Sequence, residues 1–460
     1  MTTFKKYVLL FTLSTFTLYA KTLTGVGYAP NEASAKKEAL ADLSYIIKSE
    51  VRAKAQENLL VSGENIQKNS SSKITVSSNL PLLGVVFKTN SAKQMATASL
   101  STKEVQKVYT AKLHNLNKEI NATQKALEKM DSNSQKLQQY ENLLSLLKEF
   151  DKYSSVTMLL EIPTIQPTLT KAYVKAELDK LNTKIDSIEM AAELLAKEFK
   201  KNKVYLYPPL LEHTSTATLF SSLMLKQLKS KINTVNNPLD AEYILQGEYT
   251  LSPKNMYLNY ELLDAKEHKI VASKTLTINA KAYKGVEVTP KNIEFDQLIH
   301  QGIVTSGKLH VALNSNKGDQ NLLFHEGEDV SLFVKLNKLG YFYIVGYTQT
   351  AEGSFSYLLE LQEGEGSSKF VKFVNADDAS RWINLGSFSV EAPFGVETLQ
   401  VIASNKKFTQ LPAAAYDEES GYYVISNSLK KGLEQTRGLK RKKSHKIEMS
   451  EDILNFTTME

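Results

Sequence analysis

The stretch TLTGVGYAPNEASAKKEALADLSYIIKSEV, residues 22–51, carries the clearest local pattern in this chain. A short run with two glycines, Gly25 and Gly27, precedes a segment whose apolar and small residues recur at helical spacing. Asn31 or Ser34 can accept hydrogen bonds from the free amides at a helix start. The stretch therefore predicts a strand, a glycine turn and a helix with one face built to pack on a sheet.

A nucleotide site is the functional alternative for this glycine pair. A dinucleotide-binding fingerprint needs a third glycine at position 30, where the helix must approach the strand closely. The sequence has Pro30 there, and no acidic residue follows a clear next strand at the ribose position. We therefore interpret Gly25 and Gly27 as a structural strand-to-helix corner and expect no cofactor.

The first 20 residues have the organisation of a secretory signal peptide. Lys5 and Lys6 precede the apolar run 7–18, and Leu18-Tyr19-Ala20 ends like a cleavage site. A membrane anchor is the alternative, but a span needs roughly 20 apolar residues and this run is shorter and rich in Thr and Ser. We predict cleavage after residue 20 and no transmembrane span in the remaining chain.

Composition limits the function classes further. The 460 residues predict two to four domains, and 42% hydrophobic with 23% charged residues is an ordinary globular composition. The absence of cysteine excludes disulfides, thiolate metal sites, cysteine nucleophiles and a lipid-modified cysteine. Without Lys5 and Lys6, 54 basic residues face 50 acidic ones, a net charge of +4 that does not indicate nucleic-acid binding.

The pattern along the chain predicts a multidomain α+β protein. Its expected parts are a signal peptide (1–20), a small α/β domain (21–113), a coiled-coil-like helical hairpin (114–202), an α/β middle domain (203–283), an antiparallel β-sandwich (284–428) and a basic tail (429–460) in which ILNFTTM is compatible with a last strand.

The sequence pattern predicts individual elements in three of these parts. In the first domain, strands are expected at 74–76, 80–86 and 105–113. Apolar residues at alternating steps of three and four in 113–137 and 178–199 predict the two arms of the hairpin. The hairpin is either a stalk for self-association or a helical pair that docks on its own chain. The alternation in 256–262 predicts a β-hairpin closed by DAKEHK.

No motif for catalysis or metal binding is present. The seven histidines are His114, His213, His268, His300, His310, His325 and His445, and none forms an HExxH or HxH pair. The acidic pairs Glu326 with Glu328 and Asp377 with Asp378 lie in turn-like segments where solvated acids are expected. We therefore predict no enzyme activity and assign no catalytic, cofactor-binding or metal-binding residue.

Two further segments have functional alternatives. The basic run 430–446 lacks the aromatics that single-strand binding uses for stacking, so a solvated tail is expected, with contact to anionic phospholipid as the alternative. The apolar run NLPLLGVVF, 79–87, is expected to be a buried strand rather than a membrane-touching hairpin.

Three family resemblances add to this interpretation. The G-x-G-x-A start, ALADL and KVYTAKL make 23–113 resemble the lipoprotein-20 family of Gram-negative envelope proteins, which includes the N-terminal part of flagellar assembly proteins. That family's lipid-anchored members use a cysteine, which this chain lacks. DAEYILQGEYTL makes 203–283 resemble a domain of curli-secretion, flagellar and penicillin-binding-protein-activator lipoproteins.

The third resemblance, over 320–405, is to domain of unknown function 4384, which implies a noncatalytic β module. The matching residues are Gly327, Val330, Leu332, Gly340, Tyr341, Tyr343, Ile344, Pro393, Gly395, Glu397, Leu399, Val401, Ile402, Ala403 and Ser404.

Together these features predict a noncatalytic exported protein at the periplasm or outer-membrane periphery of a Gram-negative bacterium. Its expected role is binding, assembly or scaffolding with other envelope proteins, including flagellar or secretion components. The alternative is a regulator that activates a peptidoglycan synthase.

Overall fold

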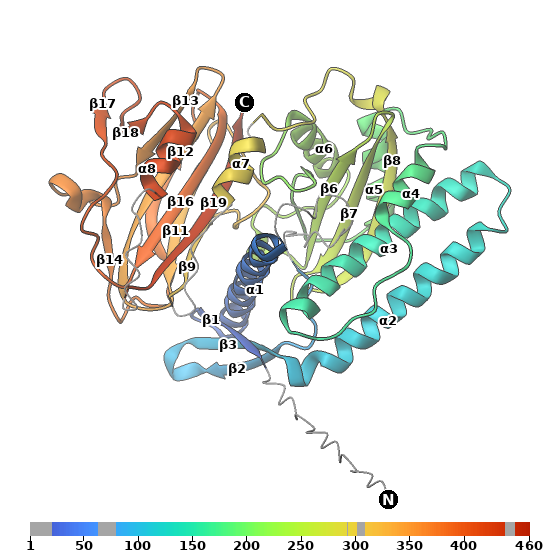
Figure 1. Ribbon diagram of the computed structural model, residues 1–460, viewed down its shortest axis with the longest axis horizontal. Coiled ribbons are helices and arrows are strands. Elements are labelled where there is room, and N and C mark those ends of the chain that lie inside the picture. The colour runs from blue at the N-terminus through green and yellow to red at the C-terminus, as the bar shows by residue number, and fades with distance from the viewer. Residues whose placement is uncertain (1–20, 63–79, 292, 301–308, 438–446) are drawn as a thin grey trace, which may run out of the picture.

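The computed structural model describes residues 21–62, 80–291, 293–300, 309–437 and 447–460. Within these ranges the chain has the predicted multidomain α+β fold. Figure 1 shows two lobes with helix α1 (Glu32–Ser62) between them: a helix-covered sheet with a long helical hairpin on one side, and a β-sandwich on the other. The predicted signal peptide, 1–20, lies outside the described residues.

A small antiparallel sheet under α1 forms the N-terminal unit. It contains β1 (Thr22–Tyr28), β3 (Met95–Ser101) and β2 (Val86–Asn90), in the order β1-β3-β2. Gly25 and Gly27 are regular residues of β1, so the predicted glycine turn is wrong. A Cβ atom on Gly25 would lie 2.2 Å from the backbone nitrogen of Leu43, and one on Gly27 would lie 2.3 Å from that of Ala39. The glycines therefore let the strand and the helix backbone touch.

The free edge of β1 is closed by acidic residues of α1. The Val26 amide donates to Asp42 Oδ2 at 2.6 Å, and the Tyr28 amide donates to Glu38 Oε2 at 3.0 Å. Burial raises the pKa of Glu38, although the Tyr28 amide and Lys335 act in the opposite direction. Because a bare strand edge can pair with another chain, these carboxylates protect the sheet as well as satisfying its amides.

Two strand predictions in this unit are corrected. Residues 105–113 belong to helix α2 (Thr102–Leu127), because Val105, Tyr109 and Leu113 are buried on one helical face. The run 80–86 is not the expected buried strand: residues 80–82 are buried, but Val86 is 39% exposed and the backbone is irregular up to β2. The Leu82 amide donates to the His268 carbonyl of the middle domain. The strand expected at 74–76 lies outside the described residues.

The long hairpin consists of α2 and α3 (Asn133–Leu159). Tyr109 and Tyr153 meet edge to face across it, with ring centroids 6.2 Å apart. The predicted second arm, 178–199, is instead interrupted: it begins at the last residue of α4 (Lys171–Leu178), continues through a non-helical segment and contains the whole of α5 (Ile188–Glu198).

Tertiary contacts explain this break in the predicted arm. The Thr183 hydroxyl donates to the carbonyl of Thr277, and the Asn279 amide donates to the carbonyl of Ile185. Residues 183–185 therefore lie along a sheet edge, and Ser187 caps the new helix through the Met190 amide. Hydrogen bonds to the edge strand β8 therefore decide the conformation of this segment, although its sequence has helical periodicity.

The middle sheet lies between helices on both faces. It is formed by β4 (Val204–Leu206), β5 (Leu210–Leu211), β6 (Tyr243–Leu251), β7 (Asn255–Asp264) and β8 (Ile270–Asn279), in the order β4-β6-β7-β8 with β5 beside β6. α5 and α6 (Leu219–Lys229) share a hydrophobic core with Leu258, Tyr260 and Leu262. α3 covers the opposite face, including Tyr257 and Leu263. The predicted hairpin is β7 and β8.

The C-terminal lobe is the predicted β-sandwich. Its strands are β9 (Val311–Ser315), β10 (Leu322–His325), β11 (Asp329–Leu336), β12 (Gly340–Thr350), β13 (Ser354–Leu358), β14 (Lys372–Val374), β15 (Ile383–Ser389), β16 (Gly395–Ser404), β17 (Ala415–Asp417), β18 (Tyr422–Ser426) and β19 (Met449–Met459). The large sheet has the order β10-β19-β16-β12-β13-β18-β17 with β14 beside β12, and the small sheet is β15-β11-β9. The β10–β19 pair is parallel, whereas the other sandwich pairs are antiparallel.

The remaining elements of the described ranges are short helices. α7 (Ile293–His300) and α8 (Leu429–Arg437) cover the outer face of the large sheet, and the 3-10 helices are Ser91–Lys93, Pro238–Asp240, Ala280–Tyr283 and Gly366–Phe370. α8 contains the start of the basic run, but Leu433 is buried and Arg437 donates to the carbonyls of Leu298 and Ile299. Residues 430–437 are therefore a packed helix rather than a solvated tail, and 438–446 lie outside the described residues.

Two elements join the lobes. α1 contacts the sandwich through Tyr45, whose hydroxyl donates to the Val311 carbonyl, and through Lys48, 3.1 Å from Asp319. β19, the strand that ILNFTTM suggested, lies between β10 and β16, and its Thr457 hydroxyl accepts from the Ala217 amide of the middle domain. The last residues of the chain thus complete the sandwich and hold it to the other lobe.

The substitution Gly27→Ala tests the close approach of β1 to α1. Strand preference alone favours alanine over glycine by about 0.5–1 kcal/mol. We expect the opposite sign, a loss of about 1–3 kcal/mol in the free energy of unfolding, because the new methyl group meets α1 backbone. Denaturant unfolding measures this, with the exposed Thr24→Ala in the same strand as control. An unchanged or increased stability of Gly27→Ala would contradict the interpretation.

Candidate functional site: the buried charged layer under α3

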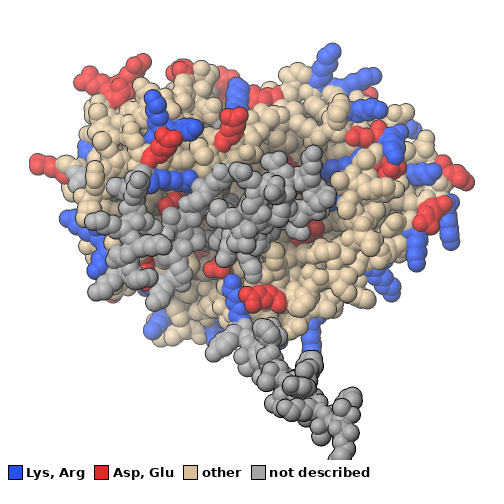
Figure 2. All heavy atoms as spheres, in the orientation of Figure 1, with Lys and Arg blue, Asp and Glu red and all other residues tan. Residues whose placement is uncertain are grey.

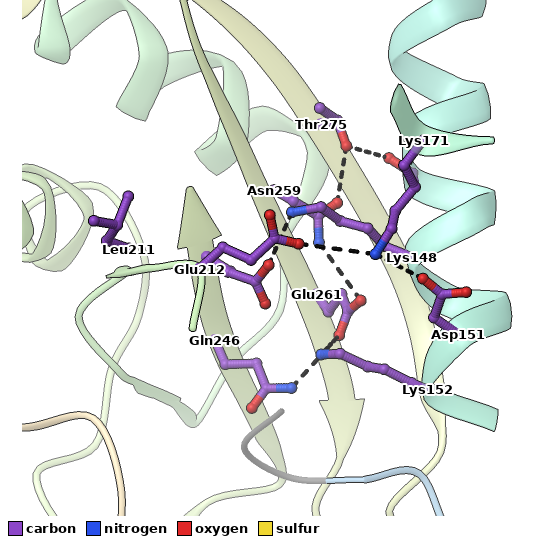
Figure 3. A network of polar contacts seen from close by, with 12 residues as sticks. Lys148, Asp151, Lys152, Lys171, Leu211, Glu212, Gln246, Asn259, Glu261 and Thr275 are labelled. Carbon is purple, nitrogen blue, oxygen red and sulfur yellow. Dashed lines mark hydrogen bonds and ion pairs between the residues drawn. The ribbon is translucent and has the colours of Figure 1, made fainter. Parts of the chain in front are cut away.

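A layer of charged side chains lies between α3 and the middle sheet (Figure 3). Alternating strands usually turn their polar face to water, but the polar face of β7, with Asn259 and Glu261, is covered by α3. Lys152 of α3 forms an ion pair with Glu261, whose side chain is 1% exposed. Gln246 and Asn259 also donate to Glu261, each at 3.5 Å. The carboxylate is thus held by one cation and two amides.

A polar stripe on α3 makes these contacts. The stripe consists of Glu141, Ser145, Lys148, Lys152 and Ser155, spaced by three or four residues and all buried. The Ser145 hydroxyl lies 2.8 Å from that of Thr275, and the Thr277 amide donates to Glu141 at 2.6 Å. Thr277 belongs to the edge strand β8, so Glu141 also closes a sheet edge.

Further ion pairs extend the layer toward α4. Lys148 lies 3.2 Å from Glu248 of β6. Lys171 lies 2.7 Å from Asp151 and 3.8 Å from Glu212, and Lys175 lies 3.3 Å from the second oxygen of Glu212. Four lysines thus face four carboxylates, and the charges of this group balance.

The electrostatics of the layer follow from burial and from these neighbours. Burial alone would raise the pKa of Glu248, but Lys148, Lys152 and Lys171 together lower it to about 2. Burial also lowers the pKa of Lys175, more than Glu212 raises it. At neutral pH the group is therefore a set of matched charges that lock α3 onto the sheet.

The structure does not bring the histidines together. Among the described residues, no three histidine or acidic side chains form a group that could hold a metal ion. His114 is exposed on α2, whereas His268 is partly buried in the turn between β7 and β8, where loss of hydration lowers its pKa to about 4. His300 contacts the Asp296 carbonyl in its own helix, and His325 lies 3.4 Å from Ser222. His213 and His310 lie in other segments, and His445 lies outside the described residues.

The acidic pairs lie in turns and take part in the hydrogen bonds of these turns. Glu328 accepts from Lys317 at 2.6 Å and from the His325 amide at 2.8 Å. Burial would raise the pKa of Glu328, but these two hydrogen bonds and the charge of Lys317 outweigh it, so the pKa is lowered. Asn375 accepts from the amides of Asp377 and Asp378, which fixes the exposed turn after β14. On the face in Figure 2, basic and acidic side chains are interspersed over both lobes.

The charged layer was missed by sequence reasoning, although a signal for it exists. Polar residues at positions 141, 145, 148, 152 and 155 recur at steps of three and four, which places them in one stripe of a helix. Such a stripe predicts a polar partner inside the protein, but it does not say which strand supplies that partner.

Comparisons with known proteins do not assign the chain to a family. No protein-family model and no curated protein matches it. One solved structure that matches is the LpoB C-terminal domain from Escherichia coli, with 8% identity, 20% of this chain and 96% of that chain covered, and a TM-score of 0.16. Another is the secreted protein HP1454 from the human pathogen Helicobacter pylori, with 14% identity, 61% and 98% covered, and a TM-score of 0.20. Scores this low do not establish a shared fold, so the family resemblances remain predictions.

A double-mutant cycle on Lys152 and Glu261 tests the charged layer. Lys152→Met alone should lower the free energy of unfolding by about 3–5 kcal/mol, because Glu261 is left buried without its cation. Lys152→Met with Glu261→Leu should lose less than Lys152→Met alone. The exposed pair Lys203 with Glu242 is the control, and Lys203→Met should change stability by less than about 1 kcal/mol. A loss in the double variant equal to the sum of the losses in Lys152→Met and in Glu261→Leu measured singly would show that the pair is not coupled.

Proposed function

We propose that this chain is a noncatalytic exported protein of the Gram-negative envelope that acts as a binding, assembly or scaffolding factor. The proposal rests on one observation: charged side chains of this protein form ion pairs that join separate modules. The balanced layer under α3, together with Asp42 and Lys335 between α1 and β11, joins separate modules. Ion pairs between modules hold the outer surfaces of these modules in fixed relative positions. A scaffold requires such fixed surfaces.

The N-terminal sequence supports an extracytoplasmic location. Residues 1–20 have the order of a signal peptide, with Lys5 and Lys6 before an apolar run. In the described part of the chain, none of the helices combines the length and the apolar character that crossing a membrane demands. The proposed place is therefore the periplasm or the periphery of the outer membrane.

The outer surface of α2 offers a contact face for a partner. This helix packs on α3 with a buried side that includes Tyr109, Leu113, Leu116 and Ile120, and its opposite side is exposed. Because the charged layer fixes α3, the position of α2 relative to the sheet is fixed as well. A partner would meet a surface that is already in place, which lowers the entropy lost on binding.

Export is tested by fractionating cells that produce the full chain. We expect the protein in the periplasmic or outer-membrane fraction with a new N-terminus near Lys21, as read by mass spectrometry. A variant that lacks residues 2–20 should remain in the cytoplasm. Recovery of the full chain in the cytoplasm with residues 1–20 intact would contradict the proposal.

The partner is identified by crosslinking in intact cells, followed by purification and mass spectrometry. Flagellar or secretion components in the crosslinked complex would support the assembly role. A peptidoglycan synthase would favour the alternative of an activator.

A further inference from the structure

One end of the sandwich holds an acidic side chain without a cation. Glu397 of β16 accepts from the hydroxyl of Thr348 at one oxygen and from the hydroxyl of Tyr357 at the other, 3.4 Å away. In the described part of the chain, no lysine, arginine or histidine forms an ion pair with it, and its pKa responds only to burial and to these two hydroxyls. This differs from Glu261 and Glu248 under α3, which form ion pairs with Lys152 and Lys148.

The backbone is shaped to bring the Tyr357 ring to Glu397. Tyr357 lies on β13, and its ring crosses the intervening strand β12 to reach β16. The crossing point is Gly346, where a Cβ atom would lie 2.1 Å from Cζ of the ring. A side chain at this position would block the ring, so the glycine permits the contact.

Two more aromatic rings complete the group. The ring of Tyr422 on β18 lies 4.3 Å from that of Tyr357, and Phe355 lies 5.8 Å from Tyr357 and 6.0 Å from Tyr422, centroid to centroid. Tyr422 is 39% exposed, whereas Tyr357 is 4% exposed. The group is therefore open to solvent on its Tyr422 side.

We propose that Glu397, Tyr357, Tyr422 and Phe355 form a binding site for an organic ammonium group, of the kind that a lysine side chain carries. The carboxylate supplies a negative charge for the ammonium group and has no cation among the described residues, and aromatic faces attract cations through their quadrupoles. Hydroxyl donors hold both carboxylate oxygens in a fixed orientation. The ammonium site goes beyond the proposed function and does not rest on it.

The charge state of Glu397 gives the site a pH dependence. Burial raises the pKa of Glu397 to about 7, although the two hydroxyls act in the opposite direction. The groups that face it from neighbouring strands are Thr348, Tyr357, Tyr422 and, on β19, Phe456. Burial raises the pKa of both tyrosines above its usual value, so they stay neutral near pH 7. Ammonium binding should therefore strengthen as pH rises through 7 and Glu397 loses its proton.

The test is a titration of the full-length mature chain with Nα-acetyl-lysine methylamide, followed by saturation-transfer NMR. The matched probe is Nα-acetyl-norleucine methylamide, which has a similar alkyl chain without the charge. We expect the lysine probe to bind at least about 10-fold more tightly, and more tightly at pH 8 than at pH 6.

Substitutions distinguish the site from general surface binding. Glu397→Gln keeps the side-chain shape and should abolish both the preference for lysine and the pH dependence. Tyr422→Ala should weaken binding by about 2-fold to 30-fold, the range of cation–π contacts. Tyr416→Ala, on the neighbouring β17 and 56% exposed, should bind as the unchanged protein does. Equal binding of the two probes, no binding of either, or unchanged binding by a folded Glu397→Gln variant would overturn the proposal.

Discussion

A charge that is buried inside a protein must be matched there, and the placement of α3 follows from this constraint. Its polar stripe meets the polar face of β7 and β8, with Lys152 opposite Glu261 and Ser145 opposite Thr275. A slide of one helical turn would leave these groups without partners at a cost of several kcal/mol. An apolar face would tolerate such a slide more readily. The charged layer therefore fixes the hairpin, and with it α2, at one position on the sheet.

The same use of side chains protects the sheet edges. On β1, Asp42 and Glu38 accept from free amides. On β8, Glu141 and the segment 183–185 do the same for Thr277 and Asn279. Carboxylates are suited to this task because they accept hydrogen bonds and do not continue the sheet. Since Asp42 also pairs with Lys335 of the sandwich, one residue closes an edge and joins two modules.

The sequence predicted elements whose pattern is local. The helix after Gly27, the β7–β8 hairpin and the strands of the sandwich all follow from periodicity and turn residues. Three features depend on distant parts of the chain and were therefore missed. Residues 105–113 combine β-branched residues with a helical face, and only burial on α3 decides between them. Residues 183–185 leave the helical pattern because β8 offers hydrogen bonds. Thr348 and Tyr357 lie 49 and 40 positions from Glu397, so no local spacing shows the site.

The contrast between Glu261 and Glu397 separates a structural carboxylate from a candidate binding residue. Both lie on a sheet face beside other side chains, but Glu261 has Lys152 while Glu397 has only hydroxyl donors. The buried charge of Glu261 is compensated by Lys152 of the same chain, so no ligand is needed to explain it. Burial raises the pKa of Glu397 to about 7, so the folded state holds this proton more tightly than the unfolded state does. Ionisation of Glu397 therefore lowers the stability of the folded chain. Departures of this kind are expected where function opposes stability. An incoming cation would remove the penalty, since it supplies the charge that α3 supplies to Glu261.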